Sequence, residues 1–171
     1  HLTSYLDINI EQQAMQEVAN FNKLVVKTHG NFNAEISSFI SSSIKQFYIQ
    51  SDGNVTFGQQ AYQQTKSLAN FTVIAKEDIT FGHSSFQSSN VNSISLYANR
   101  SVYFGQQSFQ ECENLTSLII ECGENVTFGD SCFIRSQIQE LNVTSTNSSS
   151  TTSGAMLLSD SSTISFESQS F

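Results

Sequence analysis

The chain is built on a repeat of 23 to 24 residues, and this periodicity limits the possible folds more than any other feature. Phe104-Gly105 is followed by Ser108-Phe109, and the same arrangement restarts at Phe128-Gly129. When the Phe before Gly is taken as the anchor of each unit, the anchors are Ile10, Ala34, Phe57, Phe81, Phe104, Phe128 and Phe166. Successive anchors lie 24, 23, 24, 23, 24 and 38 residues apart. Such a period is typical of solenoids, in which each unit buries its apolar face against its neighbours.

Apolar residues recur at fixed distances from the anchors. The position five residues after the anchor is aromatic or Met, and holds Met15, Phe39, Tyr62, Phe86, Phe109, Phe133 and Phe171. A small residue precedes each of these. A later triplet, such as Leu115, Leu118 and Ile120, alternates inward and outward at its end, which predicts a short β-strand. Strands that recur once per unit must lie parallel in one sheet, and the anchor half of the unit supplies the crossover between them.

The crossover begins with Val-x-Phe, which predicts a second extended segment. Gly58, Gly82, Gly105 and Gly129 then turn the chain, either with a positive φ or because two backbones approach closely. Glu11, Glu35 and Glu167 replace this Gly in other units, so a positive φ cannot be required there. We expect a short turn of α-helix or 3₁₀-helix over the next four residues, ending at the second Phe.

We interpret residues 1–171 as a single solenoid domain of about seven units. The interval of 38 residues before Phe166 is explained by a Ser/Thr-rich insertion of low complexity at 144–154. Insertions in solenoids form loops on one face. Two interpretations of this loop stay open: a plain surface loop, or a loop that carries O-linked glycans or makes contacts.

Charge and motifs exclude several classes of function. The net charge of −8 disfavours nucleic acids and anionic membrane surfaces as partners. No apolar run approaches the roughly 20 residues of a membrane span. His1, His29 and His83 are scattered, and the chain has no Gly-x-Ser-x-Gly elbow, phosphate loop or metal-binding His pair. We therefore expect no enzymatic activity, no metal and no cofactor.

The three cysteines, Cys112, Cys122 and Cys132, allow two interpretations. Cys132 occupies the small inward column, and Cys122 continues the inward parity of the preceding strand, so all could be buried thiols. Alternatively, Cys112 and Cys132 form a disulfide and Cys122 stays free. The spacing contains no Cys-x-x-Cys, which argues against zinc.

Asn-x-Ser/Thr sequons are the one enriched motif. They occur at Asn54, Asn70, Asn99, Asn114, Asn125, Asn142 and Asn147. Asn54 and Asn125 share one repeat position in an expected exposed turn, while Asn70 and Asn142 point outward by strand parity. No sequon falls in an inward column, so we expect N-linked glycans on the surface, with Asn54 and Asn125 as the safest sites.

The segment from Phe104-Gly105 through Ser108-Phe109 and Cys112 to Asn114-Leu115-Thr116-Ser117-Leu118 resembles the BspA-type leucine-rich repeat. The resemblance covers residues 8–171 and is strongest at 79–143. It implies a leucine-rich-repeat-like parallel β-solenoid with short helical or 3₁₀ turns; a parallel β-helix is the alternative. It also implies an extracellular or cell-surface protein with a role in adhesion or in a surface coat, and no catalysis. The chain departs from the family pattern because it lacks Pro after the strand and has the family's Cys only at Cys112.

Two functions follow from these observations. The first is a glycosylated structural solenoid of a cell coat or extracellular filament. The second is an adhesin that binds a surface protein or glycan with its repeat sheet. Because the expected outward strand positions hold a mixed set of modest side chains, we favour the first; they are Val25, Tyr48, Thr72, Ser95, Ile119 and Asn142.

The ends of the sequence show no polar cap. His1 starts inside the repeat pattern without a signal peptide, which indicates a processed or partial chain. Leu2 and Tyr5 at one end, and Phe166 and Phe171 at the other, would be exposed unless another coil covers them. Either the protein continues, or copies stack end to end, which gives open filaments when the rotation does not close a ring.

Overall fold

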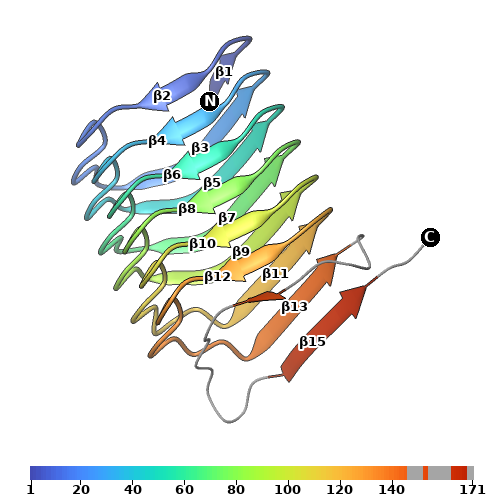
Figure 1. Ribbon diagram of the computed structural model, residues 1–171. Coiled ribbons are helices and arrows are strands. Elements are labelled where there is room, and N and C mark those ends of the chain that lie inside the picture. Colours follow the sequence, from blue (N-terminus) through green and yellow to red (C-terminus); the bar gives the residue numbers. More distant parts are fainter. Residues whose placement is uncertain (146–151, 154–162, 169–171) are drawn as a thin grey trace.

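A computed structural model describes residues 1–145, 152–153 and 163–168, with side chains for residues 1–145. The chain winds into a parallel β-solenoid of about six turns, stacked along one axis (Figure 1). The predicted fold class, a repeat solenoid of parallel strands, is confirmed.

Each complete turn contributes one strand to each of two parallel sheets, here called sheet A and sheet B (Figure 1). Sheet A has eight strands in the order β1 (Leu2–Ser4), β3 (Phe21–Thr28), β5 (Ile44–Ser51), β7 (Leu68–Ala75), β9 (Val91–Ala98), β11 (Ser117–Cys122), β13 (Glu140–Ser145) and β15 (Thr163–Ser168). Sheet B has seven shorter strands, namely β2 (Ile8–Ile10), β4 (Phe32–Ala34), β6 (Val55–Phe57), β8 (Ile79–Phe81), β10 (Val102–Phe104), β12 (Val126–Phe128) and β14 (Thr152–Ser153).

Strand pairing follows the sequence repeat without slippage. In sheet A, Phe71 pairs with Ile94, and in sheet B, Phe104 pairs with Phe128. Residues at one repeat position therefore lie directly above one another. The inward columns form a single apolar core along the solenoid, in which most side chains are fully buried.

Aromatic side chains form two stacked ladders inside this core. The anchor ladder joins Phe57 to Phe81, Phe81 to Phe104 and Phe104 to Phe128, with ring centroids 5.1, 5.2 and 5.1 Å apart. The second ladder contains Phe39, Tyr62, Phe86, Phe109 and Phe133. Each such ring pair contributes about 0.5–1.5 kcal/mol beyond its buried area. Phe residues at equivalent repeat positions therefore share one environment, as units that bury their apolar faces against their neighbours require.

The prediction of a short α-helical or 3₁₀ turn in each unit is wrong, because the described residues contain no helix. Three successive tight turns replace them, closed by bonds from Ala61 N–H to Gly58 O (3.3 Å), from Gln63 N–H to Gln60 O (3.2 Å) and from Thr65 N–H to Tyr62 O (3.4 Å). Gln60 and Gln64 adopt positive φ values of 55° and 58° in these turns. The residues that alternate with these donors bond to the next coil, as Tyr62 N–H does to Ser85 O at 2.6 Å. A helix would need these donors for its own bonds, so stacking of the coils replaces it.

The Gly that follows each anchor is required by close approach of two backbones. A Cβ at Gly105 would lie 2.7 Å from Phe81 O and 2.7 Å from the carbonyl carbon of Gly82 in the preceding coil. The positive φ values occur instead at non-glycine residues two and six positions further on. Of the two explanations that the sequence left open for this Gly, the close approach of two backbones therefore holds and the positive φ does not.

Part of the expected insertion at 144–154 belongs to regular structure. Thr144 and Ser145 complete β13, and Thr152–Ser153 form β14, which pairs with β12. The remaining insertion residues, including the sequon Asn147, lie outside the described residues.

Tyr62 provides a test of the ladder. Its ring is fully buried, and its hydroxyl has no hydrogen-bond partner among the described residues. Tyr62→Phe, which matches the rest of its column, should raise the free energy of unfolding by about 1–3 kcal/mol because an unpaired buried hydroxyl is removed. The matched variant Phe86→Tyr should lower it by a similar amount. Denaturant titration measures both, and a less stable Tyr62→Phe would show that the hydroxyl is paired.

Candidate functional site on sheet A and its turn edge

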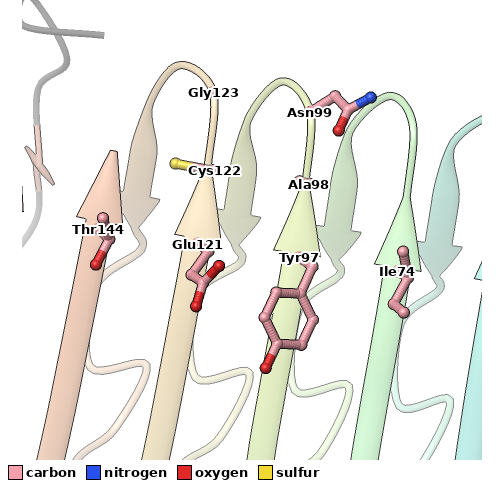
Figure 2. Close-up of a pocket in the computed structure, with 8 residues that line it drawn as sticks. All are labelled: Ile74, Tyr97, Ala98, Asn99, Glu121, Cys122, Gly123 and Thr144. Atoms are coloured by element: carbon pink, nitrogen blue, oxygen red, sulfur yellow. The ribbon is translucent and has the colours of Figure 1, made fainter. Parts of the chain in front are cut away.

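The outer face of sheet A carries a groove across four neighbouring strands. Ile74, Tyr97, Glu121 and Thr144 form one row, because each is paired in register with the next on β7, β9, β11 and β13. The groove has a volume of about 440 Å³, and Ala98, Asn99, Cys122 and Gly123 complete its lining (Figure 2).

The lining of the groove suits a ligand with hydroxyl groups and a flat apolar face. Tyr97 is half-buried and offers an aromatic ring, while Glu121 is exposed and offers a carboxylate acceptor. Thr144 adds a hydroxyl beside Glu121. These groups can bind a ligand but form no nucleophile–base pair, so the arrangement supports recognition and not covalent chemistry.

Charge is distributed unevenly along this face. Lys23 and Lys27 lie on β3 and Lys45 lies on β5, whereas Glu121 lies on β11 and Glu140 on β13, four and five strands after β3. The outward positions of β7 and β9, between these two groups, are uncharged. The face therefore changes from basic to acidic along the axis of the solenoid.

Short polar side chains form a ladder along the turn edge, between the end of each sheet A strand and the following sheet B strand. The backbone N–H of each member donates to the side-chain oxygen of the equivalent residue in the previous coil: Asn31 N–H donates to Asp7 Oδ1 (2.7 Å), Asn54 N–H to Asn31 Oδ1 (2.8 Å) and Asp78 N–H to Asn54 Oδ1 (3.1 Å). Ser101 N–H donates to Asp78 Oδ1 at 3.0 Å. Sequence analysis missed this ladder, although the column of Asp, Asn and Ser three residues before each anchor was readable.

Ion pairs cross the same edge. Lys76 Nζ lies 2.9 Å from Asp52 Oδ1, and His29 Nδ1 lies 2.7 Å from Asp52 Oδ2. The hydrogen bond from Lys76 lowers the pKa of Asp52 most, and the hydrogen bond with His29 lowers it further. Arg100 lies between Glu77 (3.4 Å) and Glu124 (3.5 Å). Because most of these side chains are exposed, the pairs align neighbouring turns more than they stabilise the fold.

The described sequons all lie at the surface. Asn54, Asn70, Asn99 and Asn114 are exposed, and Asn125 and Asn142 are half-buried. Three amide nitrogens already donate within the protein: Asn54 Nδ2 to Asn31 Oδ1 (3.3 Å), Asn114 Nδ2 to Asn90 Oδ1 (2.9 Å) and Asn142 Nδ2 to Glu140 Oε1 (2.8 Å). In the described part of the chain, the amide nitrogens of Asn70 and Asn99 make no such bond.

The disulfide that we considered between Cys112 and Cys132 is absent from the structure, where these cysteines and Cys122 are free and buried. Cys112 Sγ donates to Phe86 O at 3.1 Å. In the neighbouring coil, Ser136 Oγ makes the equivalent bond to Phe109 O at 2.8 Å. This column therefore selects a small side chain that can donate a hydrogen bond across the coils, whether a thiol or a hydroxyl.

Of the two expected assembly ends, the structure describes the side chains only at the N-terminal one. In the first coil, Leu2 and Tyr5 are exposed, and the Tyr5 ring stacks on His29 with centroids 5.1 Å apart. The side chain of Phe166 and all of Phe171 lie outside the described residues.

Within the described residues, no group of three or more His, Cys, Asp or Glu side chains is arranged to hold a metal ion. No helix in that part of the chain has the length and apolar character needed to cross a membrane.

The turn-edge ladder predicts a specific pair of variants. Asp78→Ala should lower the free energy of unfolding by about 1–2 kcal/mol, because Ser101 is buried and its N–H would lose its acceptor. Asp78→Asn should change it little, since Asn54 performs the same role one coil earlier. Denaturant titration compares the two, and equal losses would mean that charge and not the hydrogen bond matters at this position.

The buried thiols predict a loss of stability in alkali. Burial raises the pKa of Cys112 to about 12, above its usual 9.0. The unfolded thiol ionises first as the pH rises, so its contribution to stability is complete below pH 9.0 and is lost progressively towards pH 12. Cys112→Ser should keep the hydrogen bond, as Ser136 does, and should lose less stability between pH 8 and pH 11 in denaturant titrations. An identical loss in both proteins would contradict this assignment.

Comparison with known proteins agrees with this architecture. The model of the BspA type leucine-rich repeat region matches six copies over residues 35–165, which is most of the chain. No curated protein and no solved structure matches the chain. Leucine-rich-repeat solenoids are typically non-catalytic binding scaffolds, and proteins with this repeat are typically associated with surfaces. By its repeats and its fold, the chain belongs to the BspA-type leucine-rich repeat family.

Proposed function

We propose that the protein is an extracellular structural component, a glycosylated solenoid that forms a stiff element of a cell coat or filament. The observation that carries the proposal is the unbroken bonding between coils on every side of the solenoid. The strands of sheet A pair in register with one another, and so do the strands of sheet B. The turns between them add bonds such as Gln60 N–H to His83 O (3.1 Å) and Phe109 N–H to Cys132 O (2.8 Å). A rod whose coils are bonded along sheet A, along sheet B and along the turns between them resists bending, as a structural element must.

Glycosylation is the second part of the proposal. The described sequons lie at exposed or half-buried positions around sheet A and its edges, where attached glycans would project into solvent. The outer positions of β2, β4, β6, β8, β10 and β12 contain no sequon asparagine; they are Asn9, Asn33, Thr56, Thr80, Tyr103 and Thr127. Glycans would thus be attached on sheet A and in the turns beside it.

End-to-end contact between copies is the third part. The first coil leaves Tyr5 and Leu6 exposed by 84% and 77%. A further coil in the same register would cover them and pair with the edges of β1 and β2. In a filament, that coil comes from the next copy, and the basic-to-acidic gradient of sheet A gives each copy complementary ends.

A cell-surface adhesin is the second candidate, and the groove on sheet A is the observation that favours it. An adhesin would place a protein or glycan ligand against Tyr97 and Glu121. Glycans on Asn70 or Asn142 would flank such a ligand on the same face.

Assembly measurements separate these functions. Sedimentation velocity and electron microscopy of the secreted protein, at rising concentration, should show rods that lengthen. Leu6→Asp should leave the coils folded but block lengthening, because it buries a charge between copies. Tyr103→Asp is the matched control, an exposed aromatic in the middle of the stack that should not affect assembly. A wild-type protein that stays monomeric at high concentration would refute the filament and favour the adhesin.

A further inference from the structure

We propose that the groove on sheet A receives the first sugar of an N-glycan attached to Asn99 of the same chain, with the Tyr97 ring as its packing surface. This inference rests on the glycosylation in the proposed function. It adds which sequon is used structurally, where its sugar lies and which side chains hold it.

Tyr97 and Asn99 lie close together in the chain, at the end of β9. The segment reads Tyr97-Ala98-Asn99-Arg100-Ser101, so the sequon asparagine follows the aromatic residue by two positions. β9 ends at Ala98, so Tyr97 is the last outward residue of the strand and Asn99 is the first residue of the turn that follows. Both line the groove, with Asn99 at the turn beyond the end of β9 and Tyr97 on the strand below it (Figure 2).

The next coil presents only backbone beside Asn99. The residue at the equivalent turn position is Gly123, and a Cβ there would lie 1.9 Å from Asn99 O. The two coils approach too closely here for a side chain, so Gly123 contributes only backbone to the lining of the groove. In the preceding coil the equivalent position holds Lys76, whose side chain is engaged with Asp52.

The side chain of Asn99 is also available for attachment. An N-glycan replaces one of the two hydrogens on Nδ2. At Asn54, Asn114 and Asn142 that nitrogen donates within the protein, whereas at exposed Asn99 the described residues accept no bond from it. Attachment at Asn99 therefore disturbs no protein contact. This reverses the order in which the sequence ranked the sequons.

The lining matches the chemistry of an N-acetylhexosamine. One face of a pyranose ring presents C–H groups, which pack against an aromatic ring such as Tyr97. Glu121 can accept from hydroxyl or acetamido N–H groups, and Thr144 can donate to or accept from hydroxyls. The groove volume of about 440 Å³ is in the range of small-ligand sites.

Covalent attachment makes a weak contact sufficient. A sugar tethered next to the groove has an effective concentration in the millimolar range or above, so it occupies the site without high intrinsic affinity. Among the described sequons, Asn99 alone has an aromatic residue two positions before it. The other sequons follow Asp52, Leu68, Cys112, Gly123 and Glu140 at that distance.

The test is a double-mutant cycle in protein secreted from a eukaryotic host. Wild type, Tyr97→Thr, Asn99→Gln and the double variant are trimmed by an endoglycosidase that leaves one sugar, and glycopeptide mass spectrometry gives the occupancy of each site. Threonine is chosen because Thr144 occupies the same column two coils later. We expect Asn99 to be occupied and Tyr97→Thr to lower the melting temperature by about 2–4 °C in glycosylated protein, with little effect in the Asn99→Gln background.

An independent readout and a matched control accompany the cycle. The ring protons of the Asn99-linked sugar should shift upfield in NMR spectra because of the Tyr97 ring, and the shift should vanish in Tyr97→Thr. Asn70→Gln, which removes a glycan on β7 with no aromatic partner at that spacing, should show no coupling to Tyr97.

The other possible results of these experiments each contradict a defined part of the proposal. Occupied Asn99 without thermal coupling to Tyr97 overturns the groove assignment. Glycans at other sequons but not at Asn99 also overturn this inference, while leaving the glycosylated scaffold intact. No glycan at any sequon overturns both this inference and the glycosylation in the proposed function, whereas the assembly measurements decide the filament separately.

Discussion

The structure depends on one constraint: each coil must offer its backbone hydrogen bonds to the coils on either side at the same repeat position. Sheet A and sheet B satisfy it with parallel ladders in register. The turns satisfy it by alternation, since Gln60 and Tyr62 donate to the next coil while Ala61 and Gln63 donate within their own. This alternation accounts for the left-handed residues in the turns, which cost conformational energy but direct every second N–H along the axis.

Side-chain ladders follow from the same constraint. Once equivalent positions lie above one another, a side chain needs a partner of its own kind in the next coil. Gln63 Nε2 donates to Gln87 Oε1 (3.1 Å), and Gln87 Nε2 donates to Gln110 Oε1 (3.2 Å). The turn edge, the Cys/Ser column and the aromatic ladders follow the same rule with different chemistry. Buried positions therefore favour the same kind of residue in successive coils, and this explains why the repeat is visible in the sequence.

Distinct surface features arise where the outer positions break the repeat. The row that holds Ile74, Tyr97, Glu121 and Thr144 has no common chemistry, and none of these side chains points into the core. Gly123 interrupts a turn position that elsewhere carries a side chain. The groove therefore exists because neighbouring coils differ at these points. A regular scaffold with local irregularities can combine a stiff rod with a site that belongs to particular coils.

The sequence by itself determined the period, the inward columns and the aromatic ladder. These are set by spacing along the chain: a side-chain period of two within strands and a period of 23 to 24 between coils. Only the tertiary structure decided the path of the turns, the free state of Cys112, the polar ladder at the turn edge and the groove beside Asn99. Each of these depends on a contact between residues one coil apart, such as Gly123 against the carbonyl of Asn99. Hydrogen bonds that cross between coils compete with local helix formation, and local sequence signals contain no measure of that competition.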